Sequence, residues 1–209
     1  SFSDYEEARE YVLGRPFPAV LKYDGLAAGK GVVIAENAAE AEEALKDMLL
    51  DTRFGKGKVV VEDFLSGPEF SFMCFVAGDR VWPMPLAQDH KRAFDGDKGP
   101  NTGGMGAYSP LPFISDEDRQ FALNHILMKT AYAMVGEGCP LQGVLYGGLM
   151  KTPSGIKVIE FNARFGDPEC QAVLSLLDSD LLEIFEACRA GTLDQLDIRW
   201  KDGAACCLV

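Results

Sequence analysis

The sequence has 209 residues, of which 47% are hydrophobic, and a formal net charge of −12. This length and composition allow a sizeable core in one domain or in two tightly associated lobes. The acidic charge argues against binding to long nucleic acid, because that affinity comes largely from phosphate neutralisation by Lys and Arg.

The first half of the chain alternates predicted helices with predicted strands. Each helix opens on a capping box, in which a polar side chain and a glutamate three residues later satisfy free backbone N–H groups. Pro83 and Pro85 place the predicted strand at 80–87 at a sheet edge or make it irregular. In chain order we expect a helix from Ser3 with Glu6 to about Leu13, strands at 19–23 and 31–35, a helix from Asn37 with Glu40 to about Leu50, and strands at 58–65, 69–76 and 80–87.

The second half begins with a polar stretch, 88–109, that has glycines but no periodicity. We predict a functional loop there, because long loops inside compact domains are usually functional or disordered. The mixture of helices with strands in meander-like order indicates an α+β fold. The remaining predicted elements are a helix from Ser115 to about Gly136, strands at 143–150 and 157–165 joined by a turn at 152–155, and helices at 170–177 and 180–190, the last with Gly191 as its C-cap.

The segment 158–169 alternates chemical and apolar side chains. On an extended strand Glu160, Asn162 and Arg164 point to one face. A carboxylate, an amide oxygen and a guanidinium suit a hard divalent cation beside a phosphoryl group. The alternative is a surface strand with mixed polar residues. The opposite face is predicted to be core and consists of Ile159, Phe161, Ala163 and Phe165.

The glycine-rich segment 25–31 lies between two predicted strands. Backbone N–H groups of such a loop can hold phosphate, and Lys22 and Lys30 flank or join it. It is not a P-loop, because the glycine spacing is short, no Ser or Thr follows Lys30, and a strand follows instead of a helix. We predict a flap over a nucleotide, with a flexible hairpin as the alternative.

The apolar strand 59–65 leads into a short linker before Glu69. Backbone groups of such a segment can pair with an adenine edge, and Glu69 is placed to accept hydrogen bonds from ribose hydroxyls. The alternative is that Val60 and Phe64 belong to the core and that Glu62 is merely exposed.

The six cysteines form no CxxC pair and have no metal-type spacing with His90 or His125. We therefore expect reduced, mostly buried thiols. The sequence has no signal peptide and no apolar run that could span a bilayer, so we expect a cytoplasmic protein without a membrane partner. It starts without Met and ends inside the apolar run 204–209, which predicts a fragment of a longer protein.

Three long motifs in this order resemble the phosphoribosylamine–glycine ligase family, also called glycinamide ribonucleotide synthetases, within the ATP-grasp ligases. They are the flap motif at 22–31, the Gln-Asp-His-Lys-Arg motif at 88–110 and the Arg-Phe-Gly-Asp-Pro-Glu motif at 164–171. The resemblance covers essentially the whole chain. It implies an ATP-grasp fold in which two α/β lobes clamp a nucleotide, with a small lobe at 1–66 that carries the flap and a large lobe at 67–209 that carries the metal and substrate sites.

The resemblance implies that ATP drives the joining of glycine to 5-phosphoribosylamine in purine synthesis, with Mg²⁺ or, alternatively, Mn²⁺. A carboxylate is a poor electrophile, so an acyl phosphate must form before the amine attacks, and catalysis is mainly positioning and charge stabilisation. By resemblance, Glu160 and Asn162 bind the metal. The implied catalytic residues are Arg164, which stabilises the transferring phosphoryl group, and Asp89. The implied nucleotide contacts are Lys22, Gly25, Gly29, Lys30, Gly31, Glu62, Phe64, Leu65 and Glu69, and the implied substrate contacts are Asp89, Asn101, Gly103, Gly104 and Arg164.

Full-length members of the family carry additional amino- and carboxy-terminal domains that this sequence lacks. Two alternatives therefore stay open: an ATP-binding module that is inactive without those domains, or another ATP-grasp ligase that joins a carboxylate to an amine. Other purine-pathway domains in the same parent chain are further expected partners. Asp167 and Glu169 are expected to be structural, Asp167 in turn hydrogen bonds and Glu169 as the cap of the next helix.

Overall fold

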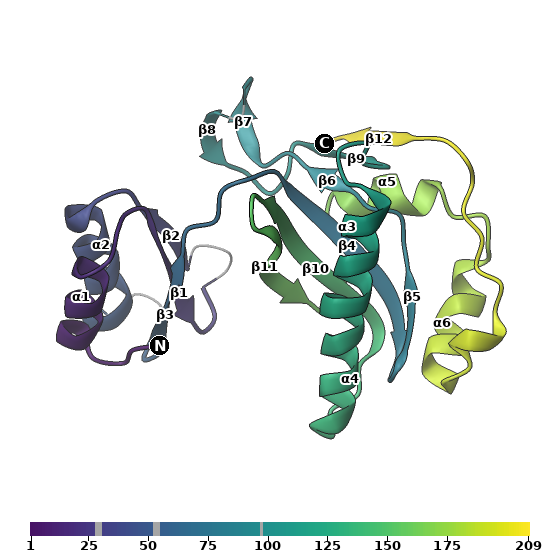
Figure 1. Ribbon diagram of the computed structural model, residues 1–209, viewed down its shortest axis with the longest axis horizontal. Coiled ribbons are helices and arrows are strands. Elements are labelled where there is room, and N and C mark those ends of the chain that lie inside the picture. The colour runs from purple at the N-terminus through teal and green to yellow at the C-terminus, as the bar shows by residue number, and fades with distance from the viewer. Residues whose placement is uncertain (28–30, 52–54, 97) are drawn as a thin grey trace. The chain divides into compact units, whose positions relative to one another are not determined.

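The computed structural model describes residues 1–27, 31–51, 55–96 and 98–209. The chain divides into two compact units, Ser1–Leu65 and Ser66–Val209, one residue before the boundary expected from the sequence. Each unit combines antiparallel strands with helices around its own core (Figure 1). Among the helices in the described ranges, none has the length and apolar character needed to cross a membrane.

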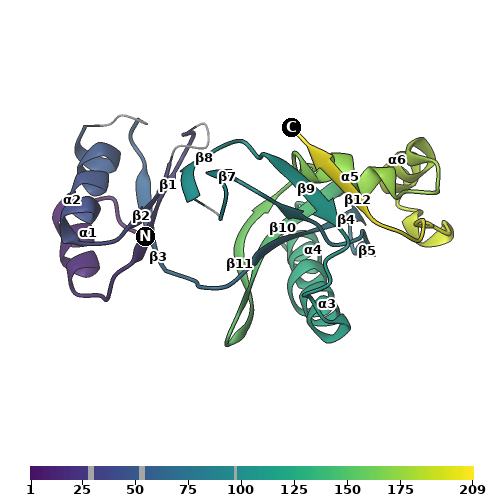
Figure 2. The ribbon, with the colours of Figure 1, turned by 90° about the horizontal axis from the view of Figure 1, so that it is seen from above.

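The amino-terminal unit is a three-stranded sheet with two helices on one face. Its strand order is β2-β1-β3, and both pairings are antiparallel. Figure 2 shows α1 and α2 side by side against the sheet, and Leu21, Leu45 and Val59 are among the buried residues between the layers. The elements are α1 (Tyr5–Leu13), β1 (Ala19–Asp24), β2 (Val32–Ala35), α2 (Ala38–Leu45), its π-helical continuation η1 (Lys46–Leu50) and β3 (Lys58–Asp63).

The second helix of this unit begins at the predicted N-cap. Asn37 Oδ1 accepts a hydrogen bond from the Glu40 N–H at 3.1 Å, and Glu40 Oε2 accepts one from the Glu36 N–H at 2.9 Å. One backbone donor of the first helical turn and the N–H just before the cap are thereby satisfied. The N-cap predicted at Asn37 is confirmed, whereas the return bond of Glu40 goes to Glu36 and not to the N-cap N–H of a capping box.

The first helix begins one residue later than the sequence analysis expected. Its N-cap is Asp4, whose Oδ1 accepts a hydrogen bond from the Glu7 N–H at 3.0 Å, so the cap predicted at Ser3 is wrong. The segment just before the helix is held as an extended bridge, because Phe2 and Val59 exchange two backbone hydrogen bonds of 2.8 Å.

The carboxy-terminal unit is organised on a four-stranded sheet of order β11-β10-β4-β5, in which every pairing is antiparallel. Because β5 lies at an edge and ends at Pro83, the edge position predicted from the prolines is confirmed. The strands are β4 (Glu69–Ala77), β5 (Arg80–Pro83), β10 (Gln142–Thr152) and β11 (Gly155–Asn162), and the helices are α3 (Asp116–Ala122), η2 (Leu123–Leu127), α4 (Met128–Gly136), α5 (Glu169–Ser175), α6 (Leu181–Ala190) and the short 3₁₀-helix η3 (Leu193–Gln195).

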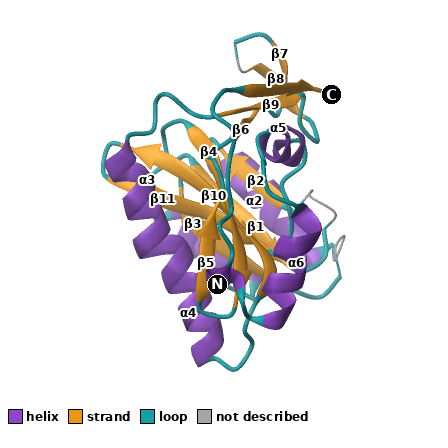
Figure 3. Cartoon of the chain, turned by 90° about the vertical axis from the view of Figure 1, so that its right-hand side faces the viewer, coloured by secondary structure: helices purple, strands orange, loops and turns teal. Residues whose placement is uncertain are grey.

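Strand β4 is buried on both faces, which explains its continuous apolar sequence. Phe72 and Cys74 belong to one core cluster, which also contains residues of the α3–η2–α4 helix. Met73 and Phe75 alternate with them and belong to a second cluster that includes residues of α5 and α6. Figure 3 shows the long helix and α6 on opposite faces of the sheet.

The predicted limits of the long helix and of α6 agree with their caps, whereas α5 runs from Glu169 to Ser175 and ends two residues before the expected limit. Ser115 Oγ accepts a hydrogen bond from the Asp118 N–H at 3.1 Å, and a continuous helix runs from there to Gly136 with a π turn in its middle. Gly191 ends α6 in the left-handed conformation, with φ of 72°, as expected for a C-cap glycine.

The stretch 88–109, predicted as an irregular loop, contains four short strands. The prediction failed because these strands are two to four residues long, too short to show a local periodicity, and because β9 also pairs with a strand about 100 residues further along the chain. Strands β6 and β9 form a sheet with β12 from the carboxy-terminal end, and β7 pairs with β8. Their bounds are β6 (Gln88–Asp89), β7 (Arg92–Phe94), β8 (Lys98–Asn101), β9 (Gly106–Ser109) and β12 (Ala205–Leu208).

A bulge interrupts the alternation expected along 158–165. Gly148 is opposite Glu160 and Leu149 is opposite Val158, so Ile159 is the extra residue of β11. Val158 and Phe161 consequently line the same groove beside the η2–α4 helix and are 38% and 40% exposed. The predicted core face is therefore wrong for Phe161.

The rest of the predicted core face divides in the same way. Ala163 is exposed and lies beyond the end of β11, whereas Ile159 is partly buried. Phe165 packs against the core cluster beneath α5 and α6.

All six cysteines are free, in agreement with the sequence analysis, but they are not mostly buried. Cys74 and Cys188 are buried, and burial raises the pKa of both thiols. Cys139 and Cys206 are exposed. The expectation failed for these because the segments that carry them, a helix-to-strand connection and a short strand, lie at the surface.

We predict that Asp4→Ala lowers the free energy of unfolding by about 1 kcal/mol, the usual contribution of an N-cap side chain. Ser3→Ala is the matched control and should change it by less than about 0.5 kcal/mol. Urea unfolding followed by far-ultraviolet circular dichroism measures both variants. A larger decrease in the free energy of unfolding for Ser3→Ala than for Asp4→Ala would show that Ser3 is the N-cap.

Candidate functional site

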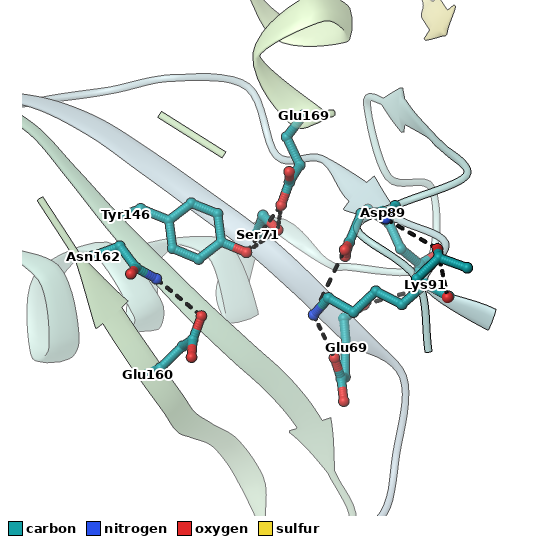
Figure 4. Close-up of polar contacts among 11 residues, drawn as sticks. Glu69, Ser71, Asp89, Lys91, Tyr146, Glu160, Asn162 and Glu169 are labelled. Atoms are coloured by element: carbon teal, nitrogen blue, oxygen red, sulfur yellow. Dashed lines mark hydrogen bonds and ion pairs between the residues drawn. The ribbon is translucent and has the colours of Figure 1, made fainter. Parts of the chain in front are cut away.

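The register of three strands brings the candidate site residues into two adjacent rows. In one row Ser71 of β4 is opposite Gly148 of β10, which is opposite Glu160 of β11. In the next row the partner of Tyr146 is Asn162. Directly opposed residues of an antiparallel pair point to the same face, so these polar side chains gather on one side of the sheet (Figure 4).

Glu160 and Asn162 form the predicted metal pair and lie next to each other. Asn162 Nδ2 donates a hydrogen bond of 2.9 Å to Glu160 Oε1, which leaves the amide oxygen and the second carboxylate oxygen for other ligands. Gly148 provides the space, since a Cβ there would approach Glu160 Cγ to 3.2 Å.

This donor set fits Mg²⁺, which commonly takes one or two protein oxygens and completes its octahedron with water and substrate phosphates. Within the described residues, no group of three or more His, Cys, Asp and Glu side chains is arranged to hold a metal ion. A cation at Glu160 and Asn162 would therefore need ligands from outside those residue types.

Arg164 lies just beyond β11, which ends at Asn162, so the expectation that it belongs to the strand is wrong. Its guanidinium carbon is 5.8 Å from the centroid of the Tyr146 ring and lies over that ring. Arg164 Nη1 also donates a hydrogen bond of 2.9 Å to the Phe165 carbonyl. The guanidinium thus stays near the predicted metal pair even though the strand has ended.

Glu169 is buried and does not cap α5. The N-cap position belongs to Pro168, which makes no side-chain capping bond. Glu169 is 2% exposed, and its Oε1 accepts hydrogen bonds from Ser71 Oγ at 2.6 Å and from the Tyr146 hydroxyl at 2.9 Å. The predicted capping role of Glu169 is therefore wrong, because the side chain turns inward to the sheet.

A second cluster, of three charged side chains, lies where β6 meets the start of β4. Lys91 Nζ is 3.4 Å from Glu69 Oε2 and 3.6 Å from Asp89 Oδ2. The Asp89 side chain is only 8% exposed, and burial, together with repulsion from Glu169, raises the pKa of its carboxyl despite the attraction of Lys91. Burial alone would lower the pKa of Lys91, but Asp89 and Glu69 outweigh it and raise that pKa.

The predicted substrate loop passes close to the same region. Gly104 has φ of +119°, and a Cβ there would approach Pro168 Cδ to 2.4 Å, so only glycine fits against this turn. A Cβ on Gly103 would meet nothing within 4 Å. The side chain of Asn101 lies outside the described part of the structure, so its predicted contact is not placed.

In the amino-terminal unit, Lys22 and Glu62 form an ion pair of 2.7 Å across β1 and β3. Two glycines of the predicted flap lie against the Tyr23 side chain. A Cβ on Gly25 would come within 2.6 Å of the Tyr23 ring, and one on Gly31 within 3.3 Å of Tyr23 Cβ. These two glycines therefore have a packing reason to be small, separate from any phosphate contact.

The other predicted nucleotide contacts of this unit are placed only in part. Gly29 and Lys30 lie outside the described residues. Phe64 is 43% exposed and Leu65 is partly buried, both after the end of β3. Glu69 belongs to the carboxy-terminal unit, together with the predicted metal and substrate residues.

Sequence reasoning missed Ser71, Tyr146 and Lys91 and gave Glu169 the wrong role. A serine between Phe70 and Phe72 in an apolar strand was the available signal, because a buried hydroxyl needs a partner. Lys91 appeared in the sequence analysis only within the Gln-Asp-His-Lys-Arg motif at 88–110. The contacts themselves join residues that are 22 to 98 positions apart and could not be found locally.

The fold agrees with solved structures of ATP-grasp proteins. N5-carboxyaminoimidazole ribonucleotide synthetase from Thermus thermophilus aligns with a TM-score of 0.63 at 19% identity, over 97% of this chain and 48% of that one. Phosphoribosylamine–glycine ligase from Thermotoga maritima aligns with a TM-score of 0.88 at 34% identity, over 99% of this chain and 52% of that one. The fold is therefore the ATP-grasp fold.

The sequence comparison identifies the family. The family described as phosphoribosylglycinamide synthetase, ATP-grasp (A) domain, matches residues 1–170. Phosphoribosylamine–glycine ligase from Listeria monocytogenes is 55% identical over 203 residues, which are 96% of this chain and 48% of that protein. The chain belongs to the phosphoribosylglycinamide synthetase ATP-grasp domain family, and it spans about half the length of the curated relatives that it matches.

We predict that Asp89→Asn stabilises the protein at pH 7 and not at pH 4. The pKa of Asp89 is raised on folding, so its stability contribution is complete below the ordinary pKa and is lost as the pH rises through the folded value. Asparagine removes that loss, although Glu69 is then the ion-pair partner that remains for Lys91 among the described residues.

Thermal unfolding of wild type and Asp89→Asn at both pH values measures the effect. The melting temperature of the variant should exceed that of the wild type at pH 7, and the difference should shrink at pH 4. Asp116→Asn, on an exposed helix turn, is the matched control and should show no such trend. A variant less stable than wild type at pH 7 would contradict the prediction.

Proposed function

We propose that this chain is the ATP-grasp domain of a phosphoribosylamine–glycine ligase. The reaction joins glycine to 5-phosphoribosylamine through glycyl phosphate and yields glycinamide ribonucleotide, ADP and phosphate in purine biosynthesis. The main support is the 55% identity to the Listeria monocytogenes enzyme over nearly the whole chain. The arrangement of Glu160, Asn162 and Arg164 on one site supports the same reaction class.

The reaction requires of the protein mainly charged groups that stabilise the phosphoryl group and a geometry that holds the reactants together. A carboxylate must be activated by phosphorylation, and the resulting acyl phosphate is then attacked by an amine. The phosphoryl group that transfers carries negative charge, which a guanidinium stabilises bidentately. Mg²⁺, when bound, would neutralise phosphate charge. The protein must hold the reactants together and exclude water.

We assign the carboxy-terminal unit the metal and substrate roles. Glu160 and Asn162 hold Mg²⁺, or Mn²⁺ in its place, because they offer adjacent hard oxygen donors. Arg164 binds the transferring phosphoryl group. Asp89 lies on the substrate side, where a buried carboxylate can bind an ammonium group. Gly103 and Gly104, with Asn101, form the backbone of the same substrate region.

Glu69 and the amino-terminal unit are assigned to the nucleotide. Glu69 accepts hydrogen bonds from ribose, and Lys22 with Glu62 contacts the phosphates or the adenine. The flap from Gly25 to Gly31 covers the phosphates, and Phe64 and Leu65 line the adenine. These assignments rest on the order of the motifs and on the Lys22–Glu62 ion pair.

We also propose a cytoplasmic location, since six free thiols are typical of a reducing compartment. Glycine and 5-phosphoribosylamine are the expected small-molecule partners. Further purine-pathway domains in the parent chain are compatible with relatives about twice as long as this chain.

The deciding experiment is an assay of ADP formation by the full-length protein. ADP should appear only when ATP, Mg²⁺, glycine and 5-phosphoribosylamine are all present. Formation of ADP with another carboxylate, and not with glycine, would favour a different ATP-grasp ligase. Calorimetry of this chain alone with Mg-ATP addresses the second alternative, because binding without turnover identifies an ATP-binding module.

We predict that Glu160→Gln lowers magnesium-dependent turnover of ATP at least about tenfold. Loss of one charged ligand or transition-state contact usually costs about 2 to 4 kcal/mol. The test is a titration of Mg²⁺ at fixed ATP in the full-length protein. Glu186→Gln on the exposed face of α6 is the matched control and should leave the titration unchanged. An unchanged magnesium dependence in Glu160→Gln would remove this residue from the metal site.

A further inference from the structure

A buried cluster of three polar side chains lies directly beneath Arg164 and has no role in the assignments above. Ser71 comes from β4, Tyr146 from β10 and Glu169 from α5. Ser71 Oγ donates to Glu169 Oε1 at 2.6 Å and the Tyr146 hydroxyl donates to the same oxygen at 2.9 Å, and the two hydroxyl oxygens lie 2.9 Å apart. Each hydroxyl has one hydrogen, so with both donated to Glu169 the Ser71–Tyr146 approach is a close contact without a third hydrogen bond. Glu169 and Ser71 are each 2% exposed and Tyr146 is 6% exposed.

The cost of this arrangement is the reason to ask what it does. A buried carboxylate is expensive unless charge or hydrogen bonds compensate it. Within the described residues, Glu169 forms no ion pair with Lys or Arg, and the hydrogen bonds that compensate its burial come from the two hydroxyls. An apolar cluster could fill the same space at lower cost. The polar cluster therefore has a geometric consequence that apolar packing would not provide.

That consequence is the position of the Tyr146 ring. The hydroxyl is held at one end by Glu169 and Ser71, while the ring is bounded on one edge by Gly148, where a Cβ would lie 3.4 Å from Tyr146 Cε1. Tyr146 is also the cross-strand partner of Asn162. The Arg164 guanidinium lies over this ring, 5.8 Å from its centroid, which is within the range of a cation–π contact.

The turn after Arg164 passes against the same carboxylate. A Cβ on Gly166 would come within 2.5 Å of Glu169 Oε2, so the backbone of the turn lies directly beside Glu169. The Gly166 N–H donates to Met73 Sδ at 3.3 Å. The Tyr146 ring under the Arg164 guanidinium and the backbone just after Arg164 thus both contact one buried side chain.

We propose that Tyr146, held by Glu169 and Ser71, is a positioning residue for Arg164. The proposal rests on the proposed function, in which Arg164 contacts the transferring phosphoryl group. Tyr146 itself touches no reacting atom. Its ring face keeps the guanidinium aimed at the site, and Glu169 keeps both the ring and the turn in place.

A double-mutant cycle in the full-length protein tests the proposal. Tyr146→Leu removes the ring and should lower kcat about five- to thirtyfold, with little change in the KM for ATP, as expected for loss of a cation–π contact. Tyr146→Phe keeps the ring, loses the anchor, and should lower kcat about two- to tenfold. In an Arg164→Lys background both effects should largely disappear, because the variants act through the same group.

Two controls separate positioning from stability. Tyr132→Leu removes an exposed tyrosine from α4, and Ile184→Val weakens the core cluster that also contains Tyr146. Neither should change kcat by more than about twofold. Effects of Tyr146→Leu and Arg164→Lys that multiply in the double variant would overturn the proposal. Absence of ADP formation in the wild type would instead count against the proposed function.

Proton NMR of this chain tests the proposal without an activity assay. It therefore applies even if Arg164→Lys is inactive and the mutant cycle cannot be measured. The Nε–H proton of Arg164, assigned by its loss in Arg164→Lys, should resonate upfield because it lies over an aromatic face. The resonance should move downfield in Tyr146→Leu and should also shift in Glu169→Gln, whereas Ile184→Val should leave it in place. An Arg164 resonance that is unchanged in both Tyr146→Leu and Glu169→Gln would refute the positioning role.

Discussion

The antiparallel register of β10 with β4 and β11 is the constraint on which the candidate site depends. It places Ser71, Tyr146, Glu160 and Asn162 on one face of the sheet, although they come from three strands. Because side chains alternate along a strand, a slip of one residue would turn every one of these groups to the opposite face. The apolar side chains of β4 oppose such a slip, since Phe72 and Met73 must each reach a different core.

The candidate site holds an excess of carboxylates, whose mutual repulsion opposes folding and favours the binding of a cation. Carboxylates of Glu69, Asp89, Glu160 and Glu169 lie around Lys91 and Arg164, so negative charge exceeds positive charge. A divalent cation bound there would relieve the excess and bring in phosphate. Ligands that bind the folded state also stabilise it by mass action. The acidity that argues against binding to long nucleic acid at the level of the whole chain therefore has a local use in the proposed function.

Much of the fold followed from local sequence because its main elements carry their own signals. Capping side chains at Asn37 and Ser115 and the prolines of β5 were read correctly. The family was recognisable because its motifs are long and continuous. The short strands between 88 and 109 were missed, since two to four residues are too few to show a periodicity and β9 is paired with the distant strand β12.

The site was predicted in the same uneven way. Glu160 and Asn162 could be paired because they are two residues apart on one strand. Tyr146 and Ser71 are brought to Glu169 only by the register and by the inward turn of α5, which no local pattern encodes.

The bulge at Ile159 has a consequence for solubility as well as for side-chain direction. Within the described residues, β11 is an outer strand of its sheet and carries the half-exposed apolar side chains Val158 and Phe161. A straight strand of that kind offers a template on which another chain can add by backbone pairing. An extra residue bends and twists the strand, which breaks the even spacing that a new partner would need. The irregularity that spoiled the predicted alternation thus protects this edge from aggregation.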